Sequence, residues 1–182
     1  MKREEYIIKE IWILTISGAF QRANIYKPNV EKEKTKFKSD LFLLIDGIAK
    51  EYVNDVSETK HLKNINSIKK ELQQYQHILQ EGQLNFGVSQ KLLNLYLKYL
   101  WCLGKIPKPP HFPVDRRIQE KMRFSVKSWT KNDFNEEKYK IIIEEAKKLA
   151  IEFQFQNVAE FELFLFNNDG DISTLKQNNS KK

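Results

Sequence analysis

The longest apolar run of the chain lies between Leu92 and Leu103, where apolar residues would fall on nearly every side of a helix. Such coverage is typical of a helix in the middle of a helical domain rather than on its surface. The run is too short to span a bilayer. Its exceptions, Lys91, Asn94 and Lys98, are spaced to form one narrow polar stripe. The pattern therefore predicts a buried central helix.

The expected boundaries of this helix follow from residues with special backbone or capping properties. A tight turn at Gly87 and Val88 is followed by Ser89, whose side chain can cap the helix, and Gly104 can end it. These boundaries place Lys91 in the first turn, where the helix dipole mildly disfavours a cation. A lysine there is either incidental or functional.

The rest of the chain alternates between helical periods of about 3.6 residues and short polar, Gly- or Pro-containing loops. Ser57, Asp115 and Asn157 stand where their side chains would cap helices. The proline-rich stretch 105–114 cannot be helical. The helices expected besides the central one are 3–20, 31–53, 58–80, 115–124, 135–154 and 158–166.

Composition is that of one globular domain. Hydrophobic residues make up 41% of the 182 residues and charged residues 30%, with only six Gly and five Pro. We predict an all-α fold, a compact helical bundle of about seven helices with a buried central helix. The single domain would cover residues 1–167, and the polar segment 168–182 would be a disordered tail.

Few residues of the chain could hold a metal or cofactor. Cys102 is the only cysteine, which excludes an intramolecular disulfide, a Cys-rich zinc site and an iron–sulfur cluster, and we expect it to be buried. The three histidines, His61, His77 and His111, have no metal-ligand spacing. Neither G-x-G-x-x-G nor a P-loop occurs. We therefore expect no metal and no nucleotide cofactor.

The N-terminal segment contains an apolar run from Ile11 to Ile16, preceded by Glu4, Glu5 and Glu10. These acidic residues do not fit a signal peptide, and no A-x-A cleavage pattern follows. We interpret the run as a buried first helix. We expect a cytoplasmic monomer that does not associate with a membrane.

Positive charge is concentrated in one segment. The formal net charge of the chain is +7, and residues 105–131 contain eight Lys and Arg against two acidic residues. Such a concentration favours a polyanionic partner, most simply nucleic acid, although a run of like charge is often only a solvated face.

Two short motifs carry a resemblance to a known family. GVSQK covers 87–91, and PVD covers 113–115. In these motifs the chain resembles the helix-hairpin-helix DNA glycosylases, particularly the 8-oxoguanine branch. There a G-V-x-x-K hairpin opens a helix and supplies a nucleophilic lysine, and a P-V-D motif supplies an aspartate at another helix start. The resemblance covers about a sixth of the chain and implies a helix-hairpin-helix element.

The resemblance implies a DNA base-excision repair glycosylase with associated AP-lyase activity on an oxidised purine such as 8-oxoguanine. Lys91 would attack C1′ of the sugar and form a Schiff base. Asp115 would stabilise the cationic sugar and help to position or deprotonate Lys91. The damaged nucleotide would be flipped out of double-stranded DNA into a pocket.

The resemblance also implies residues that contact DNA. Backbone N–H groups of the hairpin would bind a phosphate, and basic side chains would hold the DNA backbone. The candidates for DNA binding are Gly87, Val88, Ser89, Arg116, Arg117 and Lys121. Phe86, Phe112 and Trp129 are candidates for stacking on the flipped base.

Simpler interpretations remain for each of these residues. Lys91 would be a solvated lysine of a first turn, and Asp115 an N-cap without another role. The chain would then be a non-catalytic all-α nucleic-acid-binding module, or a helical protein–protein adaptor with Phe161, Phe164 and Phe166 as its exposed patch. Convergence of Lys91 and Asp115 on one cavity separates the enzyme from these alternatives.

Overall fold

The helical periods of the sequence form seven α-helices and two 3₁₀ helices in the computed structural model, which describes residues 3–168 and 171–173. No strand occurs within these residues, so the all-α prediction is confirmed. The helices are α1 (Arg3–Phe20), α2 (Glu31–Ala49), η1 (Lys50–Val53), α3 (Glu58–Glu71), η2 (Gln73–Tyr75), α4 (Phe86–Cys102), α5 (Arg116–Lys121), α6 (Glu136–Glu152) and α7 (Val158–Asn167).

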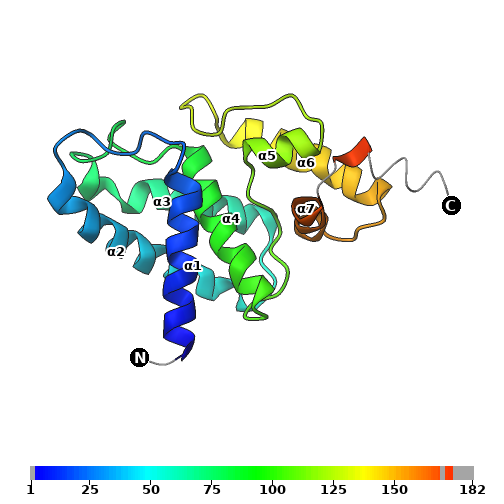
Figure 1. The fold of residues 1–182 in the computed structure, drawn as a ribbon, viewed down its shortest axis with the longest axis horizontal. Helices are drawn as coiled ribbons and strands as arrows, with labels where there is room; N and C mark the ends of the chain where they lie inside the picture. The colour runs from blue at the N-terminus through cyan, green and yellow to red at the C-terminus, as the bar shows by residue number, and fades with distance from the viewer. Residues whose placement is uncertain (1–2, 169–170, 174–182) are drawn as a thin grey trace.

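Helix α4 crosses the middle of the molecule (Figure 1). Helices α1, α2 and α3 all pack against it, and α7 packs against both α5 and α6. The connection after α4 runs back along the molecule to the start of α5 (Figure 1). This return places the first residues of α5 near the beginning of α4, although the two helices are separated by the proline-rich segment.

The predicted buried central helix is confirmed in α4. Thirteen of its seventeen residues are buried. The buried set includes the predicted polar stripe of Lys91, Asn94 and Lys98, so these side chains face protein rather than water. A buried polar side chain is costly unless it is hydrogen-bonded or paired, and the partners of this stripe form the candidate site.

The start of α4 differs from the prediction. Asn85 is the N-cap, and its side chain accepts a hydrogen bond from the backbone N–H of Val88 at 2.8 Å. Residues 86–89 are therefore the first turn of the helix, and the predicted Gly87-Val88 turn and Ser89 cap are wrong. The helix-hairpin-helix element is not confirmed, and Lys91 lies in the second turn.

The end of α4 agrees with the prediction. Gly104 has a φ of 69°, and its N–H bonds to the carbonyl of Trp101 while that of Lys105 bonds to the carbonyl of Leu100. This is the Schellman arrangement, in which a residue of positive φ ends the helix and satisfies its last carbonyl groups.

Predicted helices 58–80 and 31–53 are shorter in the structure, and 115–124 is helical only over Arg116–Lys121. The segment 58–80 is helical only to Glu71 and continues as η2 and turns. Its apolar spacing continues beyond the helix because Leu72, Tyr75 and Leu79 remain buried while the chain turns. Helix α2 likewise ends at Ala49 and is followed by η1.

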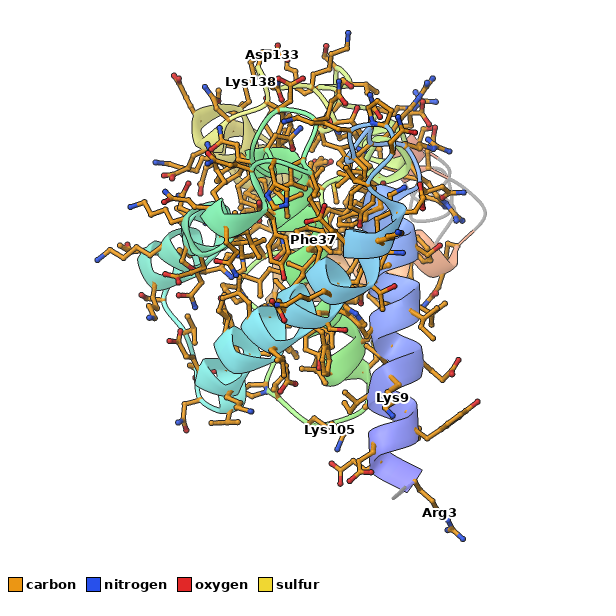
Figure 2. The ribbon with its side chains drawn as sticks, turned by 90° about the vertical axis from the view of Figure 1, so that its left-hand side faces the viewer. Arg3, Lys9, Phe37, Lys105, Asp133 and Lys138 are labelled. Atoms are coloured by element: carbon orange, nitrogen blue, oxygen red, sulfur yellow. The ribbon has the colours of Figure 1, made fainter. Side chains whose placement is uncertain are left out.

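The interpretation of α1 as a buried helix is only partly correct. Its buried residues are Ile11, Thr15 and Ala19, whereas Tyr6 and Leu14 are more than half exposed. Figure 2 shows the N-terminal half of α1, with Arg3 at its tip, extending beyond the rest of the molecule. Over the described residues, no helix combines the length and apolar character needed to cross a membrane.

Two further predictions concern the exposure of Cys102 and of the C-terminal segment. Cys102 is exposed, contrary to the prediction, because it lies at the end of α4. Within the predicted tail, Ile172 is buried and packs on the core, and Asp171 accepts a hydrogen bond from Arg123 at 2.9 Å. Residues 169–170 and 174–182 of that tail lie outside the described residues.

Two histidines lie inside the core beside α4. The rings of His61 and His111 pack edge to face with centroids 4.7 Å apart. Tyr52 hydroxyl oxygen lies 2.7 Å from Nδ1 of His61, and Tyr139 hydroxyl oxygen lies 3.0 Å from Nδ1 of His111. Burial lowers the pKa of His111 to about 3 and that of His61 well below its ordinary value.

These histidines predict acid sensitivity. Below about pH 6.5 the unfolded chain binds protons that the folded chain does not, so their contribution to stability is lost as the pH falls. The free energy of unfolding should fall by about 2 kcal/mol between pH 7 and pH 5 from His111 alone, and His61 should add to this loss. Urea unfolding of wild type and His111→Asn at several pH values measures this loss. The variant should show a smaller loss than wild type. If His111→Asn lost as much stability between pH 7 and pH 5 as wild type does, His111 would not be a source of the acid sensitivity.

Candidate active site

Lys91 and Asp115 meet at the junction of α4 and α5. Lys91 Nζ lies 3.0 Å from Asp115 Oδ2, and the two side chains are 9% and 24% exposed. Asp115 is also the N-cap of α5, because its Oδ1 accepts from the N–H of Ile118 at 3.1 Å. One carboxylate therefore caps a helix and pairs with the lysine, so capping does not exclude a second role.

Lys91 and Asp115 line the same cavity, which has a volume of about 280 Å³. The walls come from the end of α1, one side of α4, the first residues of α5, the loop before α6 and the end of α7. The lining residues are Gly18, Gln21, Arg22, Lys91, Leu95, Tyr99, Asp115, Arg116, Arg117, Trp129 and Phe166. The two predicted catalytic residues thus share one concave site.

Trp129 forms an aromatic wall of this cavity beside the lysine. Lys91 Nζ lies over its ring, 4.3 Å from the centroid, at a distance typical of a cation–π contact. The indole is buried, and its position depends on a close backbone contact. A Cβ at Gly87 would lie 1.8 Å from the carbonyl oxygen of Trp129. Only glycine allows the first turn of α4 to approach the Trp129 segment so closely.

The cavity is surrounded by more cations than anions. Arg22, Arg116 and Arg117 are exposed at its edge, whereas Asp115 is the only carboxylate among its lining residues. Arg116 Nε also donates to Glu120 at 2.6 Å. A positive rim of this kind attracts an anionic ligand such as a phosphate backbone.

Phe166 is a lining residue that the sequence did not assign to the site. Its ring lies between two cations, with Lys98 Nζ 4.3 Å and Arg117 Cζ 4.5 Å from the centroid. The sequence indicated Phe166 only as part of an exposed patch for a protein partner. Only the packing of α7 beside α4 and α5 brings it to the cavity, and no local motif signals that packing.

A second lysine–carboxylate pair lies two turns further along α4. Lys98 Nζ donates to both carboxylate oxygens of Glu162, at 2.9 and 2.7 Å. The side chains are 10% and 3% exposed, and burial raises the pKa of the Glu162 carboxyl. Neither residue lines the cavity. This pair therefore fastens α7 to α4 and holds Phe166 in place.

The structure separates the predicted base-stacking residues. Trp129 is at the cavity, whereas Phe86 packs on Tyr139 with ring centroids 5.4 Å apart and Phe112 is buried in the core. Neither Phe86 nor Phe112 lines the cavity of Lys91. Of the three residues predicted to stack on a flipped base, only Trp129 lines the cavity.

The predicted DNA-contacting residues also fall into two groups. Arg116 and Arg117 line the rim, and Lys121, further along α5, donates to the carbonyl of Asn168. The residues of the GVS segment are buried in the first turn of α4. The N–H groups of Val88 and Ser89 both bond to Asn85, so in this arrangement they are not directed at a phosphate.

In the part of the chain that the structure describes, no three His, Cys, Asp or Glu side chains are grouped so that they could hold a metal ion. The cavity offers an amine, a carboxylate and aromatic walls. No family model, no curated protein and no solved structure matches this chain. The family resemblance therefore depends on the GVSQK and PVD residues and on the geometry that joins them.

The contact between Gly87 and Trp129 predicts a localised effect of adding one methyl group. Gly87→Ala would force Trp129 backbone away from α4 and should destabilise the protein by about 1–3 kcal/mol or more. Gly47→Ala is the matched control, because its Cβ would meet nothing within 4 Å, and it should stabilise α2 by about 0.5–1 kcal/mol. Urea unfolding and tryptophan fluorescence measure both variants. Equal stability of the two variants would contradict the close contact.

Proposed function

We propose that this protein is a base-excision DNA glycosylase with associated AP-lyase activity, acting on an oxidised purine such as 8-oxoguanine in double-stranded DNA. The observation that carries the proposal is the 3.0 Å contact between Lys91 Nζ and Asp115 Oδ2 in the wall of one cavity. A nucleophile and a group able to accept its proton need this proximity. The resemblance of GVSQK and PVD assigns the same two residues.

The proposed reaction begins at the amine. Lys91 transfers a proton to Asp115, and the free Nζ attacks C1′ of the flipped nucleotide. A C1′–N bond to lysine forms while the bond from C1′ to the base breaks, and the base leaves with the electron pair and takes up a proton. Opening of the sugar ring then gives a Schiff base between C1′ and Lys91. Loss of a C2′ proton from this iminium expels the 3′ phosphate, which nicks the strand.

The cavity is suited to a single flat heterocycle. Its volume of about 280 Å³ lies just below the range of roughly 300–1,000 Å³ typical of pockets for larger ligands. Trp129 and Phe166 supply aromatic surfaces for stacking, which is how proteins commonly hold an extruded base. Asp115 next to the cavity would stabilise positive charge that develops on the sugar as the base departs.

The surroundings of the cavity support a DNA substrate. Arg22, Arg116 and Arg117 at the rim would contact phosphates on either side of the extruded nucleotide. The basic segment 105–131 continues from this rim into the loop that contains Trp129. Contacts of this kind are sequence-independent, so they hold the duplex while the cavity selects the base.

Borohydride trapping tests the lysine directly. Wild type incubated with a duplex containing 8-oxoguanine or an abasic site should form a covalent adduct, because the reductant converts a Schiff base into a stable amine. Lys91→Gln should form none, and Asp115→Asn should form it about 10²–10⁴-fold more slowly, as expected for loss of a proton-transfer group. Denaturing electrophoresis resolves the adduct.

The control for this experiment is Lys148→Gln, which removes an exposed lysine of α6 and should trap at the wild-type rate. Thermal unfolding of each variant separates loss of chemistry from loss of fold. Absence of an adduct in wild type would refute the glycosylase proposal. Salt-sensitive DNA binding without an adduct would instead indicate a non-catalytic DNA-binding module, and absence of both would favour the adaptor.

Salt dependence of DNA affinity provides a separate prediction for the rim. If Arg116 and Arg117 each neutralise a phosphate, the double variant Arg116→Gln/Arg117→Gln should reduce the slope of log K against log salt by about 1.8. Fluorescence anisotropy with a labelled duplex at several salt concentrations measures the slope. Lys148→Gln serves again as the control. An unchanged slope in the double variant would place the DNA elsewhere on the molecule.

A further inference from the structure

Gln90, the residue before Lys91, connects the two motifs of the candidate site. Its Nε2 donates to the carbonyl oxygen of Val114 at 2.8 Å, and its Oε1 accepts from the N–H of Val114 at 3.1 Å. A single side chain thus satisfies both backbone groups of one residue. Gln90 has no exposed surface, and Val114 has none either. The peptide bond of Val114 leads directly to Asp115.

These contacts fix the position of Asp115 relative to Lys91. The proline-rich connection contains no helix or strand that would hold its last residues against α4. The amide of Gln90 supplies the missing backbone partners, in the way that a neighbouring strand would. Because Gln90 and Lys91 are consecutive in α4, the lysine and the segment carrying the carboxylate are held by the same helical turn.

A second buried glutamine, Gln119 of α5, holds the loop between α5 and α6. Gln119 Nε2 donates to the carbonyl oxygen of Lys127 at 3.0 Å, and its Oε1 accepts from the N–H of Lys127 at 2.7 Å. Gln119 Nε2 also lies 3.1 Å from the carbonyl oxygen of Asp115. Trp129 follows two residues after Lys127. The two glutamines therefore fasten the Asp115 and Trp129 segments, and Gln90 is the one attached to the nucleophile's own helix.

We propose that Gln90 is the positioning residue of this site, holding Asp115 at proton-transfer distance from Lys91 through its paired hydrogen bonds to Val114. The inference rests on the proposed function and deepens it. Gln90 does not line the cavity, so it acts on the reaction through Asp115 and leaves the binding of DNA unchanged. Its role is distinct from that of the catalytic lysine and from stacking on the base.

Gln90→Met tests the proposal, because methionine is similar in size and lacks the amide. Adduct formation under single-turnover conditions should slow by about 10- to 100-fold, as expected when a reacting group is displaced by about 1 Å, while the Kd for an uncleaved duplex stays at the wild-type value. Asp115→Asn supplies the diagnostic background, since asparagine can still cap α5. Adding Gln90→Met to Asp115→Asn should cause no further slowing, because the carboxylate that Gln90 positions is already absent.

Leu41→Ala is the control for a general loss of stability, because Leu41 is a fully buried residue of α2 that does not line the cavity. Leu41→Ala should slow adduct formation only slightly. The factor of slowing should be the same in the wild-type protein and in Asp115→Asn. The positioning role would be overturned if Gln90→Met formed the adduct at the wild-type rate. It would also be overturned if Gln90→Met slowed Asp115→Asn by the same factor as it slows wild type. Either outcome would leave the glycosylase proposal intact. Failure of wild type to form an adduct would overturn both.

Gln90→Glu adds a readout that a purely structural role would not change. A neutral carboxylic acid reproduces the donor and acceptor pattern of the amide, whereas a carboxylate would face the carbonyl of Val114 with no proton to donate. The trapping rate of Gln90→Glu relative to wild type should therefore rise as the pH falls. A ratio that is constant from pH 5 to pH 8 would contradict the paired hydrogen bonds as the source of the effect.

Discussion

The burial of polar side chains along one face of α4 is the constraint on which the rest of the structure depends. A buried amide or ammonium group is costly without a partner, and a helix enclosed by protein cannot use water for this purpose. Each of four such side chains has a partner beyond α4, in the C-terminal half of the chain, so these contacts join that half to the N-terminal helices. The pairs are Gln90 with Val114, Lys91 with Asp115, Asn94 with Tyr139 and Lys98 with Glu162.

The polar stripe and its helix could be predicted from local sequence, but of its partners only Asp115 could. Periodicity identifies Lys91, Asn94 and Lys98 as one face because helical geometry is local. Glu162 lies far along the chain, and its proximity depends on how α7 packs. The role of Gly87 also depends on a residue distant in the sequence. Its local context indicated a turn, whereas in the structure the glycine allows α4 to approach the carbonyl of Trp129.

Aromatic residues illustrate why the cavity itself could only be partly predicted. Phe86 and Phe112 directly precede the two motifs and Trp129 lies further along the chain, yet only Trp129 lines the cavity beside Lys91. Phe166 reaches the same cavity from a distant helix, held between Lys98 and Arg117. Asp115 was predictable because two signals coincide there: the PVD motif, and a side chain suited to capping the helix that follows.

The two lysine–carboxylate pairs of α4 allow a comparison within one helix. A buried ion pair adds little net stability, because removing charges from water costs about as much as their attraction returns. Lys98 and Glu162 fit that description, since both are enclosed and neither reaches the cavity. Lys91 and Asp115 have the same chemistry and similar spacing but line a cavity with a positive rim, and Asp115 is 24% exposed. Access to a ligand is the difference between the pairs. It favours a reactive role for Lys91, whereas fastening α7 is sufficient to explain Lys98.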